Sequence, residues 1–297
     1  MVGIVDPTGR VVSKEKVLLK PDIEENFVFE TIIRLSRNLL KEYRNTGIDC
    51  AGVAIPGLAD SENGIWIYSC FSGLRDLKVA DILSNELGIP VFIDNDVNAC
   101  AYGEKIYGSC REVNDYIWVT VSNGVGGGLI INGSLYMGAY RNAGEIGHIN
   151  VVENGYRCKC GNCGCLEAYV AGPAIARRYK EKTGYRCGCE ALDAKSIAES
   201  ARKGDRHARE VYRETGHYLG KAIASAVNII NPQKVILGGG IAMDIDLFFA
   251  ELKETVDDLK FKEANKDLII EGTVLSYDAA LIGAAATAQK GMRRVCL

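Results

Sequence analysis

The sequence predicts an α/β protein, because strand-like apolar runs alternate with segments of helical spacing along most of the chain. Three runs have the pattern of buried strands that end in polar or glycine-rich residues: "CAGVAIPG" (50–57), "PVFIDND" (90–96) and "PQKVILGGG" (232–240). Between them, apolar residues recur at helical spacing, as at 25–45 and 205–230. A length of 297 residues is sufficient for two domains of this class.

The first part of the chain is expected to alternate strands and helices as far as Tyr107. In order, the sequence predicts two short strands around the turn "DPTG" (6–9), a helix at 25–45, a strand at 50–57, a helix at 79–88, a strand at 90–96 and a helix at 97–107. Gly88 is the expected end of the second helix, because glycine readily adopts the left-handed conformation that closes a helix.

The second part opens with "DYIWVTVSNGVGGGLIING" (115–133), in which two apolar runs flank a glycine-rich turn. Asn132-Gly133 predicts a further hairpin turn. Helices are expected at 172–183, 195–203 and 205–230, followed by a strand at 232–240, a last strand at 267–275 and a final helix at 278–291.

The composition excludes several classes of partner. The formal net charge of -3 gives no reason to expect nucleic acid or an anionic membrane surface. No run of eighteen apolar residues is present, and the N-terminus has no basic-then-apolar signal segment, so we expect a cytoplasmic protein. Eleven cysteines in a reducing compartment are not expected to form disulfides; most of those outside the central cluster are expected to be buried apolar residues. The role of the pair Cys187 and Cys189 stays open.

A cluster of metal-ligand residues lies near the middle of the chain, in "GEIGHINVVENGYRCKCGNCGCLEAY" (144–169). His148, Cys158, Cys160 and Cys165 follow the pattern H-x9-C-x-C-x4-C, which suits tetrahedral zinc. Because all four positions are filled by protein, the pattern predicts a structural zinc rather than a catalytic one. Cys163 is spare. Free thiols in a loop are the alternative.

Two carboxylates flank this cluster and are expected to be held in place by the metal. Glu145 lies three residues before His148, and Glu167 lies two residues after Cys165. Two fixed acceptors at one rim suit a polyhydroxylated ligand. The alternative is that both are surface glutamates.

Polar and glycine-rich residues follow three of the predicted strands. In "FIDNDVNA", Asp94, Asn95, Asp96 and Asn98 lie where a strand meets a helix, a place where ligands collect in α/β sheets. Helix capping by one of them is the alternative. The glycine turn "SNGVGGG" (122–128) could hold phosphate oxygens with backbone N–H groups, or could be a tight hairpin turn alone. "GGG" at 238–240 allows close approach of a flat ligand, or is a bare strand-to-helix turn.

Together, "AIPG", "DNDVNA", "NGVGGGLIING", "AGEIGH", "CKCGNCGCLEAY" and "VILGGGI" resemble the ROK family of repressors, open reading frames and sugar kinases. The resemblance covers essentially the whole chain. It implies the two-lobed, actin-like ATPase (ribonuclease H-like) fold of hexokinases. The implied lobes are 1–108, completed by a C-terminal helix at 279–292, and 109–278, which carries the zinc loop.

The resemblance also implies a reaction, the transfer of the ATP γ-phosphoryl group to a sugar hydroxyl, usually at C6, with Mg²⁺ and a structural Zn²⁺. Asp96 would be the general base. Gly57, Asn95, Glu145, His148 and Glu167 would hold the sugar. Asn123, Gly124, Gly126, Gly127 and Gly128 would face the phosphates, and Gly238 and Gly239 the adenosine. The substrate is expected to be a hexose or an N-acetylhexosamine, and the protein a homodimer.

The sequence departs from the family pattern at three places, of which the mildest is Asn123, where the family usually has threonine. In "SCFSG" (69–73), Phe71 replaces an asparagine that contacts sugar, which puts glucose itself in question. The family's opening strand ends in Asp-x-Gly-Gly-Thr, and we expect its residues to lie upstream of Met1 in the natural sequence. In the sheet of the first lobe, this strand is expected to lie between the second strand and the strand at 50–57. Without it we expect little kinase activity. A sugar-binding regulator or an inactive family member is the alternative function, although regulators carry a helix-turn-helix before the first lobe and this sequence shows none there.

Overall fold

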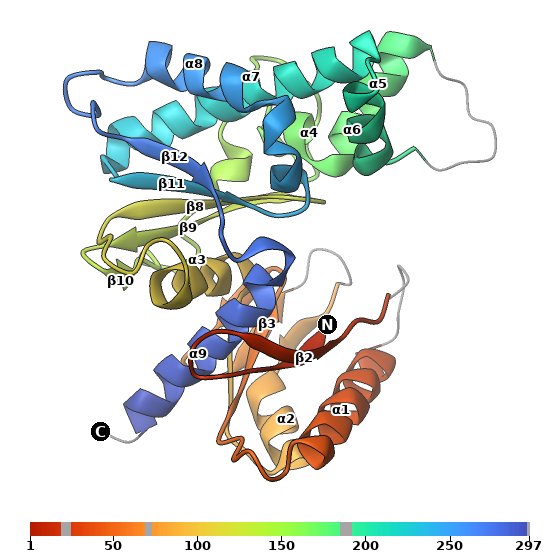
Figure 1. Cartoon of the computed structure of the whole chain (residues 1–297), viewed down its shortest axis with the longest axis vertical. Helices are drawn as coiled ribbons and strands as arrows, with labels where there is room; N and C mark the ends of the chain where they lie inside the picture. The colour runs from red at the N-terminus through yellow and green to blue at the C-terminus, as the bar shows by residue number, and fades with distance from the viewer. Residues whose placement is uncertain (19–24, 69–72, 185–191, 296–297) are drawn as a thin grey trace. The chain divides into compact units, whose positions relative to one another are not determined.

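The computed structural model describes residues 1–18, 25–68, 73–184 and 192–295 of the chain (Figure 1). Phe71, Cys187 and Cys189, which the sequence singles out, lie outside these residues. The chain divides into two compact units. Unit 1 comprises Met1–Glu112, Met137–Asn142 and Tyr277–Leu297, and unit 2 comprises Val113–Tyr136 and Ala143–Ser276. The short segment 137–142, which the sequence assigned to the second lobe, therefore belongs to unit 1.

Unit 1 contains three small sheets among its described residues. Strands β1 (Val2–Val5) and β2 (Val11–Glu15) are antiparallel, and β3 (Ala51–Ile55) runs parallel to β7 (Val91–Asn95). Strands β4 (Leu58–Asp60), β5 (Ile65–Tyr68) and β6 (Arg75–Leu77) form an antiparallel sheet that the sequence did not predict. Among the strands described, β3 pairs with β7 alone, and no strand joins it to β1 or β2.

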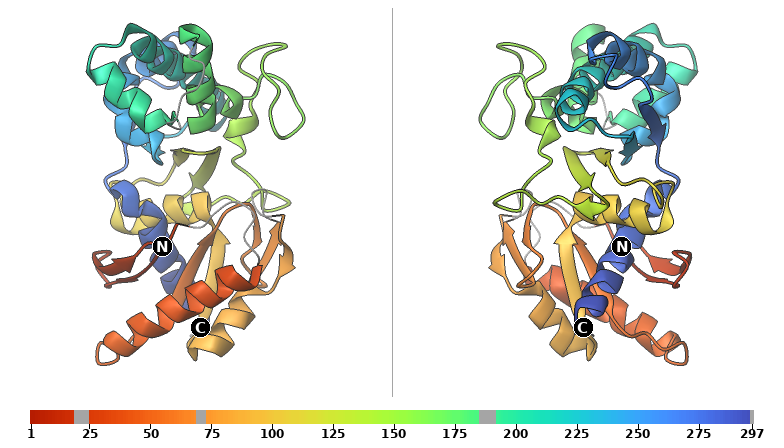
Figure 2. Two further views of the ribbon diagram at one scale, coloured as in Figure 1. Left: turned by 90° about the vertical axis from the view of Figure 1, so that its right-hand side faces the viewer. Right: turned by 90° about the vertical axis from the view of Figure 1, so that its left-hand side faces the viewer.

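Helices cover both faces of the β3–β7 pair (Figure 2). On one face, α1 (Glu25–Glu42) and α2 (Val79–Leu87) contribute Phe29 and Leu83 to a core with Ile55 and Ile93. On the other face lie α3 (Asp96–Tyr107) and α9 (Ala279–Val295). The alternation of side chains along a strand explains this division, because successive residues point to opposite faces.

Close contact between α9 and the sheet depends on glycine. A Cβ atom at Gly52 would lie 1.8 Å from the carbonyl oxygen of Ala284, and one at Gly291 would lie 2.2 Å from the Phe92 ring. Gly103 of α3 meets Gly283 of α9 in the same way, at 2.9 Å. The helix α9 therefore packs with its backbone directly against β3 and α3.

Unit 2 is built on a five-stranded sheet of order β10-β9-β8-β11-β12 (Figure 1). The strands are β8 (Tyr116–Val121), β9 (Val125–Ile131), β10 (Ser134–Leu135), β11 (Lys234–Gly238) and β12 (Ile269–Gly272). Strands β8, β11 and β12 are parallel, whereas β9 and β10 run antiparallel to their neighbours. Asn132 and Gly133 both have positive φ, as the predicted hairpin turn requires.

Helices complete the core of unit 2. They are α4 (Glu167–Val170), α5 (Gly172–Thr183), α6 (Ala194–Arg202), α7 (Arg206–Ile230) and α8 (Phe249–Leu259), with short 3₁₀ turns at Ile146–His148 and Ile241–Leu247. A third 3₁₀ turn, Ser276–Asp278, spans the boundary between unit 2 and unit 1. The sequence predicted α5, α6 and α7 within one residue but missed α4 and α8. Among the helices described, none has the length and apolar character needed to cross a bilayer.

We expect Gly52→Ala to lower the free energy of unfolding by about 1–3 kcal/mol, the usual cost of inserting a methyl group into a filled space. The methyl group would have to displace the backbone of α9, which cannot move as a side chain can. Differential scanning calorimetry would measure the shift in Tm.

The control is Gly272→Ala in β12, where the nearest atom to the added Cβ lies 3.8 Å away. If Gly52→Ala and Gly272→Ala unfolded at the same temperature, the close packing of α9 would be contradicted.

Candidate functional site

The end of β7 shows which of the four predicted polar residues caps the following helix. Asn95 is the N-cap of α3, and its Oδ1 accepts hydrogen bonds from the N–H groups of Val97 (2.9 Å) and Asn98 (3.1 Å). Its Nδ2 donates to the carbonyl oxygen of Gly57 at 2.9 Å, and Gly57 has a φ of 94°. Asn95 therefore ties the start of α3 to the turn after β3.

Asp96 is the first residue of α3 and is not needed as its cap. Its carboxylate accepts a hydrogen bond from the N–H of Val97 at 3.0 Å. Burial raises the pKa of Asp96 from an ordinary value of 3.8 to about 6. At neutral pH the carboxylate is thus ionised, with a higher affinity for a proton than an exposed aspartate.

Asp94 and Asn98 make further contacts at the junction of β7 and α3. Asp94 is buried; its Oδ1 accepts from the Asn95 N–H at 2.8 Å and lies 3.5 Å from Asn98 Nδ2. Burial raises the pKa of Asp94, and the positive charge of Lys290 in α9 opposes that rise. From the sequence, Asp94 and Asn98 were expected only to contact a ligand or to cap the helix. Their contact with each other was not predicted.

In unit 2, the four predicted metal ligands come together. One ligand atom from each of His148, Cys158, Cys160 and Cys165 lies within 4.8 Å of the others. His148 Nδ1 is 3.8 Å from Cys158 Sγ, and the sulfur atoms of Cys160 and Cys165 are 3.6 Å apart. These spacings and this donor set fit one tetrahedral zinc ion, in which neighbouring ligand atoms are separated by similar distances.

The thiols of the cluster differ in their surroundings. Burial raises the pKa of the Cys158 and Cys165 thiols, whereas the backbone N–H of Asn162 lowers the pKa of the exposed Cys160. A bound cation would stabilise all three as thiolates. Cys163 is exposed and outside the group, and its carbonyl oxygen accepts a hydrogen bond from Asn150.

The two flanking glutamates have different environments. Glu145 is exposed, and its Oε2 lies 3.8 Å from His148 Nε2. Glu167, at the start of α4, accepts a hydrogen bond from the backbone N–H of Val125 at 3.0 Å, and its Oε1 lies 4.0 Å from Cys158 Sγ. Glu167 therefore connects the metal cluster to strand β9. The sequence did not identify Val125, because a backbone N–H has no residue signature.

The glycine-rich segment is only partly a turn. The connection between β8 and β9 is Ser122–Gly124, with Asn123 exposed, whereas Gly126, Gly127 and Gly128 are paired in β9 with Thr120, Val119 and Trp118. The single long turn expected for 122–128 is therefore wrong. The glycines of β9 allow close packing instead. A Cβ atom at Gly127 would lie 2.6 Å from the Gly144 carbonyl oxygen, so the segment that carries Glu145 lies directly on β9.

The glycines after β11 also meet protein atoms at close range. A Cβ atom at Gly238 would lie 2.2 Å from the buried ring of Trp118, and one at Gly239, whose φ is 90°, would lie 2.4 Å from the carbonyl oxygen of Val121. These contacts give both glycines a packing role within unit 2. Contact with adenosine stays a prediction for them.

The sequence profile described as the ROK family matches residues 1–291, and the chain belongs to this family. It is 32% identical over 294 residues to a glucokinase of Thermotoga maritima, across 96% of this chain and 92% of the relative. It is 30% identical over 297 residues to the DNA-binding transcriptional dual regulator NagC of Escherichia coli, across 98% of this chain and 73% of the regulator.

Among solved structures, a ROK family glucokinase from Streptomyces griseus, in complex with glucose and AMPPNP, superposes with a TM-score of 0.84. The sequence identity is 28%, and the match covers 97% of this chain and 95% of that one. The predicted actin-like ATPase fold is thereby confirmed. Both sugar kinases and transcriptional regulators are therefore related to this protein.

For the metal cluster, we expect one zinc ion per chain, lost in Cys160→Ser and retained in Cys163→Ser. Cys160 is in the ligand group and Cys163 is not, although both are exposed thiols three residues apart. Metal analysis of the purified variants would measure this difference. Loss of zinc from Cys163→Ser alone would contradict the ligand assignment.

Proposed function

We propose that this ROK-family protein is an ATP-dependent kinase that phosphorylates a hexose or an N-acetylhexosamine at the C6 hydroxyl. The observation that carries the proposal is the environment of Asp96. Its carboxylate is placed at the end of a parallel strand, is not used as the helix cap, and has a pKa raised to about 6. Ligands of open α/β sheets commonly bind at such strand ends.

Asp96 would act as the general base. With a pKa of about 6 it is ionised at pH 7 and can accept the hydroxyl proton as the oxygen attacks the γ-phosphorus of ATP. Phosphoryl transfer depends mainly on positioning and on stabilisation of charge, so a base of this modest strength is sufficient. Asn95, whose amide holds the Gly57 carbonyl, would fix the strand ends around the sugar.

Glu145, His148 and Glu167 would supply further contacts to the sugar hydroxyls. His148 Nδ1 faces the thiols and its Nε2 faces Glu145, so one ring can serve the metal and a hydroxyl at once. A zinc ion held by His148 and the three cysteines would be fully coordinated, and would supply order to the loop rather than chemistry.

The phosphates of ATP, with Mg²⁺, would lie at the β8–β9 turn. Asn123 and Gly124 are in the turn itself, and Gly126, Gly127 and Gly128 continue from it into β9. Gly238 and Gly239, after β11, would lie beside the adenosine. The complex of the S. griseus glucokinase with AMPPNP and glucose supports a nucleotide and a sugar as the two substrates.

A second candidate function is sugar-responsive regulation. The 30% identity to NagC favours it, because this value is close to the 32% identity to the T. maritima glucokinase. The two functions share a sugar site and differ in catalysis, so an assay of ATP consumption separates them.

We expect a purified protein that carries the family's opening strand to consume ATP with at least one sugar from a panel of hexoses and N-acetylhexosamines. Asp96→Asn should lower kcat by about 10²-fold or more, the usual scale for loss of a general base, and leave sugar affinity within about tenfold. Coupled assays and calorimetric titration with sugar would measure the two quantities.

Asp81→Asn is the control, since it makes the same change at an exposed position of α2. Sugar binding without ATP consumption by the wild type would favour the regulator, and full turnover by Asp96→Asn would exclude Asp96 as the base.

The pH dependence of kcat/KM should follow the Asp96 carboxylate. Because its pKa is raised, the carboxylate becomes protonated, and unable to accept a proton, as the pH falls through about 6. We expect kcat/KM to be constant near neutral pH and to fall about tenfold per unit at lower pH. Initial rates from pH 4.5 to 8 would measure this profile. An unchanged inflection in the residual activity of Asp96→Asn would assign the titration to another group.

A further inference from the structure

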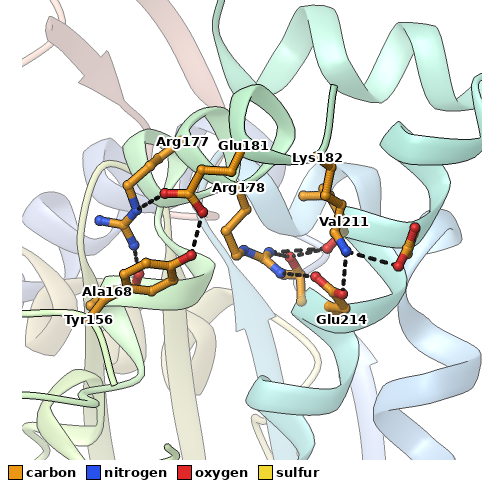
Figure 3. A network of polar contacts seen from close by, with 10 residues as sticks. Tyr156, Ala168, Arg177, Arg178, Glu181, Lys182, Val211 and Glu214 are labelled. Atoms are coloured by element: carbon orange, nitrogen blue, oxygen red, sulfur yellow. Dashed lines mark hydrogen bonds and ion pairs between the residues drawn. The ribbon is translucent and has the colours of Figure 1, made fainter. Parts of the chain in front are cut away.

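A network of polar contacts joins the metal loop to the helices of unit 2 (Figure 3). At its centre, the guanidinium of Arg177 in α5 lies over the ring of Tyr156, 3.9 Å from the ring centroid. The Nη2 of Arg177 also donates a hydrogen bond to the carbonyl oxygen of Ala168 at 2.5 Å. One side chain thus contacts two segments that are separate in the sequence.

Tyr156 is the point at which this network enters the metal loop. Its carbonyl oxygen accepts from the N–H of Gly164, the residue before the ligand Cys165, and it lies two residues before the ligand Cys158. Its hydroxyl donates to Glu181, whose other oxygen lies 3.8 Å from Arg177 Nε (Figure 3). The Tyr156 ring is therefore held on one side by Arg177 and at its tip by Glu181.

Ala168 is the second point of attachment, and it follows Glu167 directly in α4. Glu167 accepts the Val125 N–H and approaches Cys158 Sγ, so its carboxylate must keep one orientation to make both contacts. The hydrogen bond from Arg177 to the Ala168 carbonyl fixes the backbone beside it. Arg177 therefore restrains both the metal loop and the residue proposed to hold sugar.

The helix that carries Arg177 is itself firmly anchored. The neighbouring Arg178 is buried and bonds to three groups of α7: Glu214 Oε2 at 2.9 Å, the Val211 carbonyl oxygen at 3.1 Å and Thr215 Oγ1 at 2.5 Å. At the start of α5, the N–H of Gly172 donates to the carbonyl oxygen of Ser122, in the β8–β9 turn. Helix α5 is thus a fixed support against which loop, turn and α4 are all positioned.

We infer that Arg177 is a positioning residue. By holding Tyr156 and Ala168, it keeps the metal ligands and the Glu167 carboxylate in the relative positions that sugar binding requires. The part that concerns sugar rests on the proposed function; the part that concerns the metal does not. Arginine suits the task because its planar group can stack on an aromatic ring while its edge donates hydrogen bonds, which lysine cannot do.

Arg177→Met and Arg177→Lys test the inference, with Lys180→Met as the control at an exposed position of the same helix. The zinc-loaded proteins are mixed with a chromogenic chelator, and the rate of zinc release is measured without sugar or ATP. Both Arg177 variants should release zinc about 10- to 100-fold faster than the wild type, the usual effect of removing a group that orients metal ligands. Lys180→Met should release it at the wild-type rate.

Two further measurements separate positioning from general stability. Tyr156→Leu removes the ring, and combined with Arg177→Met it should add little to the release rate, because both changes break the same contact. Kinetics should show a sugar KM raised about tenfold with kcat within about threefold, because Arg177 would act through Glu167, which is proposed to bind the sugar, and not through the proposed base Asp96.

The outcomes distinguish failure of this inference from failure of the proposed function. If both Arg177 variants released zinc at the wild-type rate, with or without a lower Tm, the positioning role would be overturned. Faster release from a protein that shows no ATP consumption with any sugar would support Arg177 and count against the kinase. Equal release rates for Arg177→Met and Lys180→Met would show that the contact with Tyr156 has no effect on the metal loop.

Discussion

The hydrogen bond from the Val125 backbone to the Glu167 carboxylate is the contact around which the candidate site of unit 2 is arranged. The same carboxylate approaches Cys158, so β9, α4 and the metal loop meet at one charged group. A partly buried carboxylate needs such partners, because its charge is costly to remove from water. Contact between Gly127 and Gly144 brings the remaining segment onto β9 without intervening side chains. A change in any one of these segments is therefore transmitted to the others.

Much of the fold could be predicted because its signals are local. Helices α5, α6 and α7 have apolar spacing along their whole length, and the ends at Gly88 and Asp205 are marked by residues that favour caps. The small sheet β4–β6 and the helix α8 were missed. The strands of that sheet are three or four residues long, too short to establish a period of two. Helix α8 has eleven residues and is separated from the glycines at 238–240 by the 3₁₀ turn Ile241–Leu247.

The metal cluster was the most predictable part of the site, because its ligands lie within one short stretch and their spacing is itself the signal. Sequence reasoning also singled out Asp96, but could not tell that Asn95 is the cap that leaves it available. The sequence also suggested that Gly126, Gly127 and Gly128 belong to the β8–β9 turn, whereas they lie in β9. A run of glycines is compatible both with a turn and with a strand that packs closely against another segment of backbone. The pairing of Tyr156 with Arg177 has no periodic signature and required the structure.

The division of unit 1 into three stretches of sequence affects the order in which the protein can fold. Helix α9, which covers one face of β3 and β7, is synthesised about 170 residues after the rest of that face. At ribosomal speeds this is a delay of roughly 10 to 30 s, during which the apolar surface of β3, β7 and α3 stays uncovered. Unit 2, by contrast, is nearly continuous in sequence and is complete before α9 emerges. The part of the protein that is made first is therefore completed last, once α9 has been synthesised.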